Sequence, residues 1–195
     1  MEYLKEVFAH YDKTWIRVYQ AYNPTIAAEA VALQTFGPHF NRNRMTWIKP
    51  SFLWMMYRSN WGTKKDQECI LALDLHQSMF WELLEKAVLT SPDSPYYTGI
   101  QWRKALDETT VYCQWDPDKS IHGTPIQRAA IQLGIKGDTL DKFLKTGIYR
   151  IQDLTPSVRK WNQQRKEGKL NPENLPTERL FPVQDQTIRN RLNMQ

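Results

Sequence analysis

The sequence predicts a single α+β domain, with a mixed or mostly antiparallel sheet flanked by helices. Three observations support this class. The 195 residues suffice for one domain with a hydrophobic core and are too few for two ordinary ones. Hydrophobic residues make up 41% and charged residues 24%, as in a globular chain. Segments with strand and helix patterns alternate irregularly, without the βαβ rhythm of a parallel sheet.

The strand candidates are short segments rich in β-branched and aromatic residues. We expect strands at 15–22, 44–49, 69–75, 111–117 and 126–135, with residues 148–155 closing the core. Period two places Arg17 and Tyr19 on one face of the first strand and Gln20 on the other. The continuous apolar run at 69–75 (CILALDL) predicts a central strand covered on both faces.

Capping residues mark the helices. Asn23 followed by Pro24 is an N-cap and N1 pair, which predicts a helix that ends at Gly37. Pro50 and Ser51 open a second helix, which is apolar on most sides and therefore expected to be buried. Further helices are expected at about 78–89, from 138 to 147 and from 155 to 168, followed by a mostly extended tail.

Missing motifs exclude several chemistries. The chain has no GxGxxG, P-loop or GxSxG pattern, and Cys69 and Cys113 have no partners at zinc-ligand spacing. We therefore expect no metal site. No apolar run approaches eighteen residues, and the first residues lack a signal-peptide core, so we expect a cytoplasmic protein that does not enter a membrane.

The positive charge is concentrated in one part of the chain. Lysine and arginine number 26 against 21 acids, a net charge of +5. Residues 30–65 contain no Asp or Glu, and the cations of this acid-free window are Arg42, Arg44, Lys49, Arg58, Lys64 and Lys65. Trp47, Trp54 and Trp61 recur in it every seven residues. Such a surface suits phosphates and a stacked ring, of a nucleotide or of nucleic acid. The alternative is a set of core tryptophans with solvated cations around them.

Arg17 lies in the middle of an otherwise apolar strand and needs a partner. Asp74 or Asp116 on a neighbouring strand could pair with it, and so could a bound anion. Asp116 could also form a carboxylate pair with Glu108. The sequence leaves these alternatives open.

Several motifs resemble the signature of a microbial family of single-domain proteins, a domain of unknown function. They are VYQAY at 18–22, RMTWIKPSFLWMMYRS at 44–59, QWDP at 114–117 and AIQLG at 130–134. The segments ERLFP at 178–182 and RLNM at 191–194 resemble the family's ending. The resemblance spans nearly all of residues 1–195. It implies that the basic helix and extended tail of residues 155–195 pack on the core.

The order of motifs is also similar to that of the ADP-ribosyltransferase superfamily, whose members hold NAD in a cleft between two small sheets. Matched in that order, Arg17 is the first element, Ser51 or Tyr57 the second and Gln114 the third. The chain departs from the pattern at Gln114, where a glutamate is expected. The resemblance therefore implies that Asp116 or Glu108 provides the carboxylate, or that a nucleotide is bound without transfer.

The resulting hypothesis is an ADP-ribosyltransferase-like domain that binds NAD and transfers ADP-ribose to a nucleic-acid, protein or small-molecule acceptor. Arg17, Arg44 and Lys49 would hold phosphates, and Gln114 with Asp116 would face the ribose. The residues expected to stack on a ring or to complete the cofactor site are Trp47, Tyr19, Ser51 and Tyr57. Two alternatives stay open. One is a nucleic-acid-binding module on the same basic aromatic surface, and the other is a partner-binding domain without a small ligand.

Overall fold

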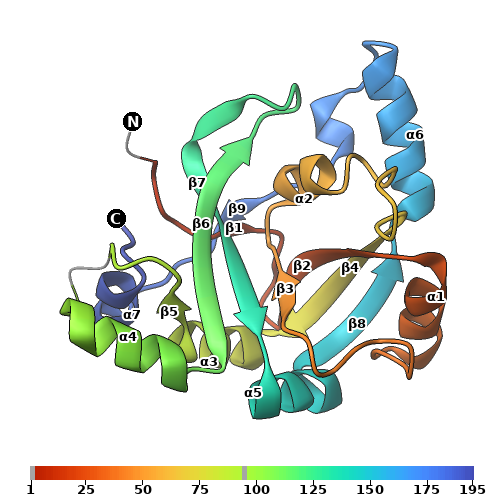
Figure 1. The fold of residues 1–195 in the computed structure, drawn as a ribbon. Coiled ribbons are helices and arrows are strands. Elements are labelled where there is room, and N and C mark those ends of the chain that lie inside the picture. Colours follow the sequence, from red (N-terminus) through yellow and green to blue (C-terminus); the bar gives the residue numbers. More distant parts are fainter. Residues whose placement is uncertain (1–2, 94–95) are drawn as a thin grey trace.

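The computed structural model describes residues 3–93 and 96–195 (Figure 1). Its strands are β1 (Phe8–Ala9), β2 (Trp15–Tyr22), β3 (Thr46–Ile48), β4 (Cys69–His76), β5 (Val88–Leu89), β6 (Val111–Lys119), β7 (Pro125–Ile135), β8 (Ile148–Asp153) and β9 (Arg179–Leu180). Its α-helices are α1 (Pro24–Leu33), α2 (Phe52–Arg58), α3 (Gln77–Lys86), α4 (Gly99–Glu108), α5 (Gly137–Lys142), α6 (Thr155–Lys166) and α7 (Gln186–Arg191). A π-helical turn, η1 (Phe143–Gly147), continues α5, and a short 3-10 helix, η2 (Pro172–Asn174), follows α6.

Two sheets form the centre of the molecule, which confirms the α+β class. One sheet has the antiparallel order β2-β4-β8, and the other has the order β3-β7-β6-β5, in which β5 and β6 are parallel. Figure 1 shows the long β6–β7 hairpin beside the three-stranded sheet. The sheets meet where the amide of Tyr19 in β2 donates to the carbonyl of Lys49, just after β3, over 2.7 Å. Beyond this bridge the two strands diverge.

The strand β4 is covered on both faces, as its apolar sequence predicts. Leu71, Leu73 and Leu75 lie in the larger core cluster, together with side chains of β2, β6, β7 and α3. Ile70 and Ala72 lie in a second cluster, where α2 and α6 cover the other face of the three-stranded sheet. Apolar layers therefore pack against both faces of this sheet, although β4 also carries the fully buried carboxylate of Asp74.

The expected caps fix the two helices nearest the junction of the sheets. The Asn23 side chain accepts a hydrogen bond from the Ile26 amide at the start of α1, and Ser51 accepts one from the Trp54 amide at the start of α2. Each cap satisfies an amide that has no partner within its helix. The caps thus hold the ends of β2 and β3 close to the first turns of α1 and α2.

The tail packs along the N-terminal segment. Strand β9 pairs with β1, and the Phe181 amide donates to the Val7 carbonyl over 2.8 Å. Phe181, Val183 and Ile188 are buried in the larger core cluster. In the part of the chain that the structure describes, no helix is long and apolar enough to cross a bilayer.

The structure departs from the predicted elements at several places. Helix α1 ends at Leu33 rather than at Gly37, because the backbone of Gln34 takes a left-handed conformation with φ 56°. The helix expected at 78–89 ends at Lys86, because Val88–Leu89 pair with β6 as strand β5. Helix α4 occupies Gly99–Glu108, where no helix was predicted, and none of its residues is fully buried. The tail, expected to be extended, contains the short helix α7.

Candidate functional site

A cavity of about 420 Å³ lies where β2 and β3 diverge. The end of β2 and the segment leading into β3 form two of its walls, and α2 with residues 66–67 contributes a third. Its lining includes Gln20, Tyr22, Asn23, His39, Phe40, Arg44, Thr46, Trp47, Lys49, Met55, Arg58, Asp66 and Gln67. The acid-free window of the sequence therefore supplies most of this wall.

The cavity wall carries an excess of positive charge. Arg44 precedes β3, Lys49 follows it, and Arg58 ends α2, so three separate stretches of chain bring cations to one place. Among the described lining residues Asp66 is the single acid. An anion is the ligand charge that such a wall favours.

The pKa of Lys49 is strongly lowered by its surroundings. Its ammonium donates to the Trp47 carbonyl over 3.0 Å and lies 5.8 Å from the centre of the Trp54 ring. Burial, together with the nearby positive charge of Arg58, lowers the pKa of Lys49 to about 7, against the opposing effect of Asp116. Close to neutral pH this side chain therefore holds its proton only weakly and would gain it back beside an anion.

Trp47 lines the cavity together with the aromatic residues Tyr22 and Phe40. It is half-buried, and its ring lies against β7 at Gly134, where an added Cβ would be 2.9 Å from ring atoms. Trp54 and Trp61 are buried and belong to the packed layer around α2. Of the three regularly spaced tryptophans, Trp47 is thus the one placed to contact a ligand in the cavity.

Tyr19, Ser51 and Tyr57 are held within the protein. Tyr19 is fully buried, with its ring edge against Phe52, so it offers no free face for stacking. The Ser51 hydroxyl donates to Asp118 over 2.7 Å, and the Tyr57 hydroxyl donates to the Ile121 carbonyl over 2.6 Å. None of the three lines the cavity described above.

The Ser51 contact belongs to a buried polar cluster that joins α2 to the tail. Arg128 donates to Asp118 and to Glu178, both over 2.6 Å, and the Phe52 amide also donates to Glu178. Burial raises the pKa of Glu178 to about 7 against the opposing effect of these donors. This cluster has a full set of partners within the chain and acts as a structural junction.

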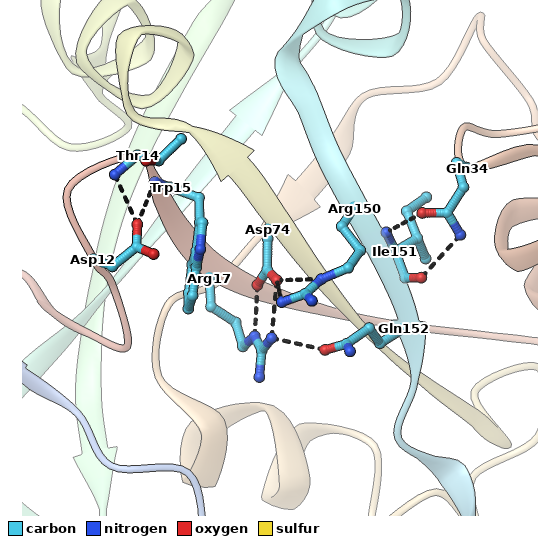
Figure 2. A network of polar contacts seen from close by, with 9 residues as sticks. All are labelled: Asp12, Thr14, Trp15, Arg17, Gln34, Asp74, Arg150, Ile151 and Gln152. Carbon is cyan, nitrogen blue, oxygen red and sulfur yellow. Dashed lines mark hydrogen bonds and ion pairs between the residues drawn. The ribbon is translucent and has the colours of Figure 1, made fainter.

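Arg17 pairs with Asp74, one of the alternatives that the sequence left open. Two guanidinium nitrogens donate to the Asp74 oxygens over 2.6 and 2.9 Å, and one also donates to Gln152. Arg150 of β8 binds the same carboxylate from the other side, as Figure 2 shows. The Asp74 side chain is completely buried, whereas that of Arg150 is 43% exposed.

Gln114 and Asp116 lie on β6, away from Arg17. Asp116 accepts hydrogen bonds from the side-chain amides of Gln114 and Gln132. Gln114 is exposed and lines a second cavity of about 350 Å³ beside β5. Glu108 ends α4, where its closest cation is Lys104 at 4.0 Å.

The site residues expected from the sequence therefore separate into groups. Arg44, Trp47 and Lys49 share the cavity between β2 and β3, and Asp116 acts on Lys49 through its charge. Arg17, Ser51 and Gln114, the three matched by motif order, each have different contacts. Sequence reasoning missed the uncharged lining residues, which carry no signal before the strands are placed. Among these are Gln20, Tyr22, Thr46 and Gln67.

Comparison with protein-family models finds a match to the family described as Domain of unknown function (DUF4291) over residues 6–181. The match spans β1 to β9 and so includes the whole cavity. A search of curated proteins finds no relative that matches the chain.

Proposed function

We propose that this chain, which belongs to the DUF4291 family, binds NAD or a related nucleotide in the cavity between β2 and β3. The observation that carries the proposal is the convergence of Arg44, Lys49 and Arg58 on one cavity whose wall also holds the Trp47 ring. The cavity volume of about 420 Å³ lies within the usual range of small-molecule sites, roughly 300–1,000 Å³.

Each part of a nucleotide has a counterpart in the wall. Guanidinium and ammonium groups form short, charge-assisted hydrogen bonds with phosphate oxygens. Arg44 and Arg58 are exposed, so they can move to a phosphate, whereas Lys49 is half-buried and its ammonium donates to the Trp47 carbonyl. The Trp47 ring offers a base or nicotinamide an aromatic face for stacking.

Transfer of ADP-ribose is the reaction that the superfamily resemblance implies. The bond between the ribose C1′ and the nicotinamide nitrogen breaks with its electron pair going to nicotinamide. C1′ then bonds to an acceptor hydroxyl or amine, which loses a proton. The acceptor class is a nucleic acid, a protein or a small molecule. Asp116 is the candidate carboxylate for this step, because it lies close enough to Lys49 to affect its charge. The proposal does not use Arg17 or Ser51, which neither line the cavity nor act on the charge of Lys49.

Calorimetric titration with NAD tests the binding proposal, with Arg44→Met compared against Arg42→Met. Both arginines are exposed and lie two residues apart, but Arg44 lines the cavity and Arg42 does not. We expect Arg44→Met to weaken NAD binding about tenfold or more, since a hydrogen bond to a charged group contributes about 1.5–3 kcal/mol. Arg42→Met should bind as the wild type does.

Several outcomes would overturn this proposal. Equal losses in the two variants would place the nucleotide outside the cavity. No heat with NAD, together with strongly salt-dependent binding of single-stranded RNA, would favour the nucleic-acid module instead. If NAD binds but nicotinamide is never released with any acceptor tried, the domain binds a nucleotide without transferring ADP-ribose.

A further inference from the structure

We infer that Gln20 selects the ligand of the β2–β3 cavity by accepting a hydrogen bond from it. The preferred ligand then carries an amino or carboxamide N–H group where it meets Gln20, rather than a carbonyl or carboxylate oxygen. This inference rests on the proposed nucleotide function and specifies which nucleotides the site takes.

The orientation of the Gln20 amide is fixed by its neighbours. Its Nε2 donates to the Thr46 hydroxyl over 2.7 Å and to the Trp47 carbonyl over 3.0 Å. A backbone carbonyl can only accept, so the nitrogen must face Trp47 and the oxygen must face away from it. The side chain is 2% exposed, and both bonds tie it to β3.

The carbonyl oxygen of Gln20 has no donor among the described residues, although it is buried. Buried side-chain oxygens in proteins nearly always accept a hydrogen bond. Gln20 also forms part of the cavity wall, next to Tyr22 and Thr46. In the proposed complex, a group of the ligand that enters the cavity supplies the missing donor.

A second acceptor lines the same cavity from another wall. The side-chain oxygen of Gln67 is likewise buried without a donor among the described residues, and Gln67 lines the cavity. An NH₂ group carries two hydrogens and can serve two acceptors, whereas a carbonyl or carboxylate oxygen carries none. Two unpaired amide oxygens around one cavity thus favour an NH₂-bearing ligand.

The Gln20 side-chain nitrogen belongs to a chain of hydrogen bonds that includes two hydroxyl groups. The Thr46 hydroxyl lies 3.0 Å from the Tyr22 hydroxyl, so the chain Gln20–Thr46–Tyr22 is connected by hydrogen bonds. Turning the Gln20 amide over would set its oxygen against the Trp47 carbonyl oxygen, which is also an acceptor, although the Thr46 hydroxyl could still donate to it. Flipping the Gln20 amide therefore cannot accommodate a ligand that carries an oxo group at this position. The cavity then discriminates against such a ligand.

The two NH₂ groups of NAD distinguish the possible orientations of the ligand. The nicotinamide end carries a carboxamide, which becomes a carboxylate in the nicotinic acid analogue. The adenine end carries an amino group, which becomes a carbonyl oxygen in the hypoxanthine analogue. Whichever end of NAD contacts Gln20, the analogue altered at that end places an acceptor oxygen against the Gln20 oxygen, which is also an acceptor.

The test is titration of the wild type with NAD, its nicotinic acid analogue and its hypoxanthine analogue. We expect one analogue to bind at least about tenfold more weakly than NAD, because a site built around a hydrogen bond rejects ligands that lack the group. Gln20→Met and Gln67→Met should reduce that preference. Gln127→Met, a change of an exposed glutamine on β7, should leave it unchanged.

The outcomes separate this inference from the function on which it rests. If all three nucleotides bind equally well to the wild type, the inference is wrong and the nucleotide site stands. If none of them binds, both are wrong. A preference that survives in both Gln20→Met and Gln67→Met would also overturn the inference. Since the wild-type comparison needs no variant, misfolding of one variant cannot hide the answer.

Discussion

Replacing Lys49 by Met tests how the cavity handles a bound phosphate. Burial and Arg58 lower the pKa of Lys49 from its ordinary value near 10.5 to about 7, so about half of the molecules carry the charge at pH 7. A bound pyrophosphate raises this pKa again. We therefore expect NAD binding to take up about 0.5 proton at pH 7 and about 0.9 at pH 8, from the fraction of Lys49 that is neutral beforehand.

The affinity follows the same titration. Raising the pH from 7 to 8 lowers the charged fraction of Lys49 about fivefold, so the wild-type affinity should fall about fivefold. Lys49→Met removes a charged hydrogen-bond donor and should weaken binding about 10- to 100-fold at pH 6. The difference in NAD affinity between the wild type and Lys49→Met should disappear towards pH 9, where Lys49 is mostly neutral. The pyrophosphate of NAD does not titrate in this range.

Calorimetry in buffers of different ionisation enthalpy measures the proton uptake directly. The Lys49→Met variant serves as the baseline, and the difference between wild type and this variant isolates the proton uptake of Lys49. Without ligand the unfolded chain binds more protons at Lys49 than the folded one between pH 7 and 10.5. Wild-type stability should thus rise with pH across that window, and that contribution should vanish in Lys49→Met. Equal proton uptake by the two proteins at pH 8 would refute the reasoning.

Two further predictions concern stability, measured as the free energy of unfolding in urea. Arg17→Met leaves the buried Asp74 with Arg150 as its one remaining arginine partner. This change should cost about 3 kcal/mol of the free energy of unfolding, at the lower end for a broken buried pair, while NAD affinity stays unchanged. A variant that folds normally but loses NAD binding would contradict the structural role of Arg17. Phe181→Ala removes a ring that contacts Tyr11 and should cost about 3–5 kcal/mol. The neighbouring Leu180→Ala, 49% exposed, should cost under about 1 kcal/mol, and similar losses for both would mean that the tail is not part of the core.

Elements with dense local signals were predictable from the sequence. The strand at 15–22 has the bounds of β2, because β-branched and aromatic residues fill it between a charged turn and an Asn-Pro cap. Helix α4 was missed although its apolar residues gather on one face about as strongly as those of α3, and none of its residues is fully buried. Its capping box of Thr98 and Gln101 was the signal that could have revealed it. Strand β5 has only two residues and depends on pairing with β6, which no local pattern indicates.

The candidate site was predictable only in its charged part. Arg44, Trp47 and Lys49 lie within six residues of one another, so the short strand between them brings them to one wall. Gln20 comes from another strand and becomes a wall residue only through the bridge between Tyr19 and Lys49. The partner of Arg17 depended on register, which places Asp74 directly opposite it. Such pairings between distant segments follow from the packed fold rather than from any local sequence pattern.

A crystal structure of the protein with NAD bound tests the central claim most directly. We predict the pyrophosphate between β2 and β3, within hydrogen-bond distance of Lys49 and of Arg44 or Arg58, with one ring of the ligand against Trp47. NAD bound elsewhere, for example at Arg17 and Arg150, or beside Gln114 in the second cavity, would contradict the account.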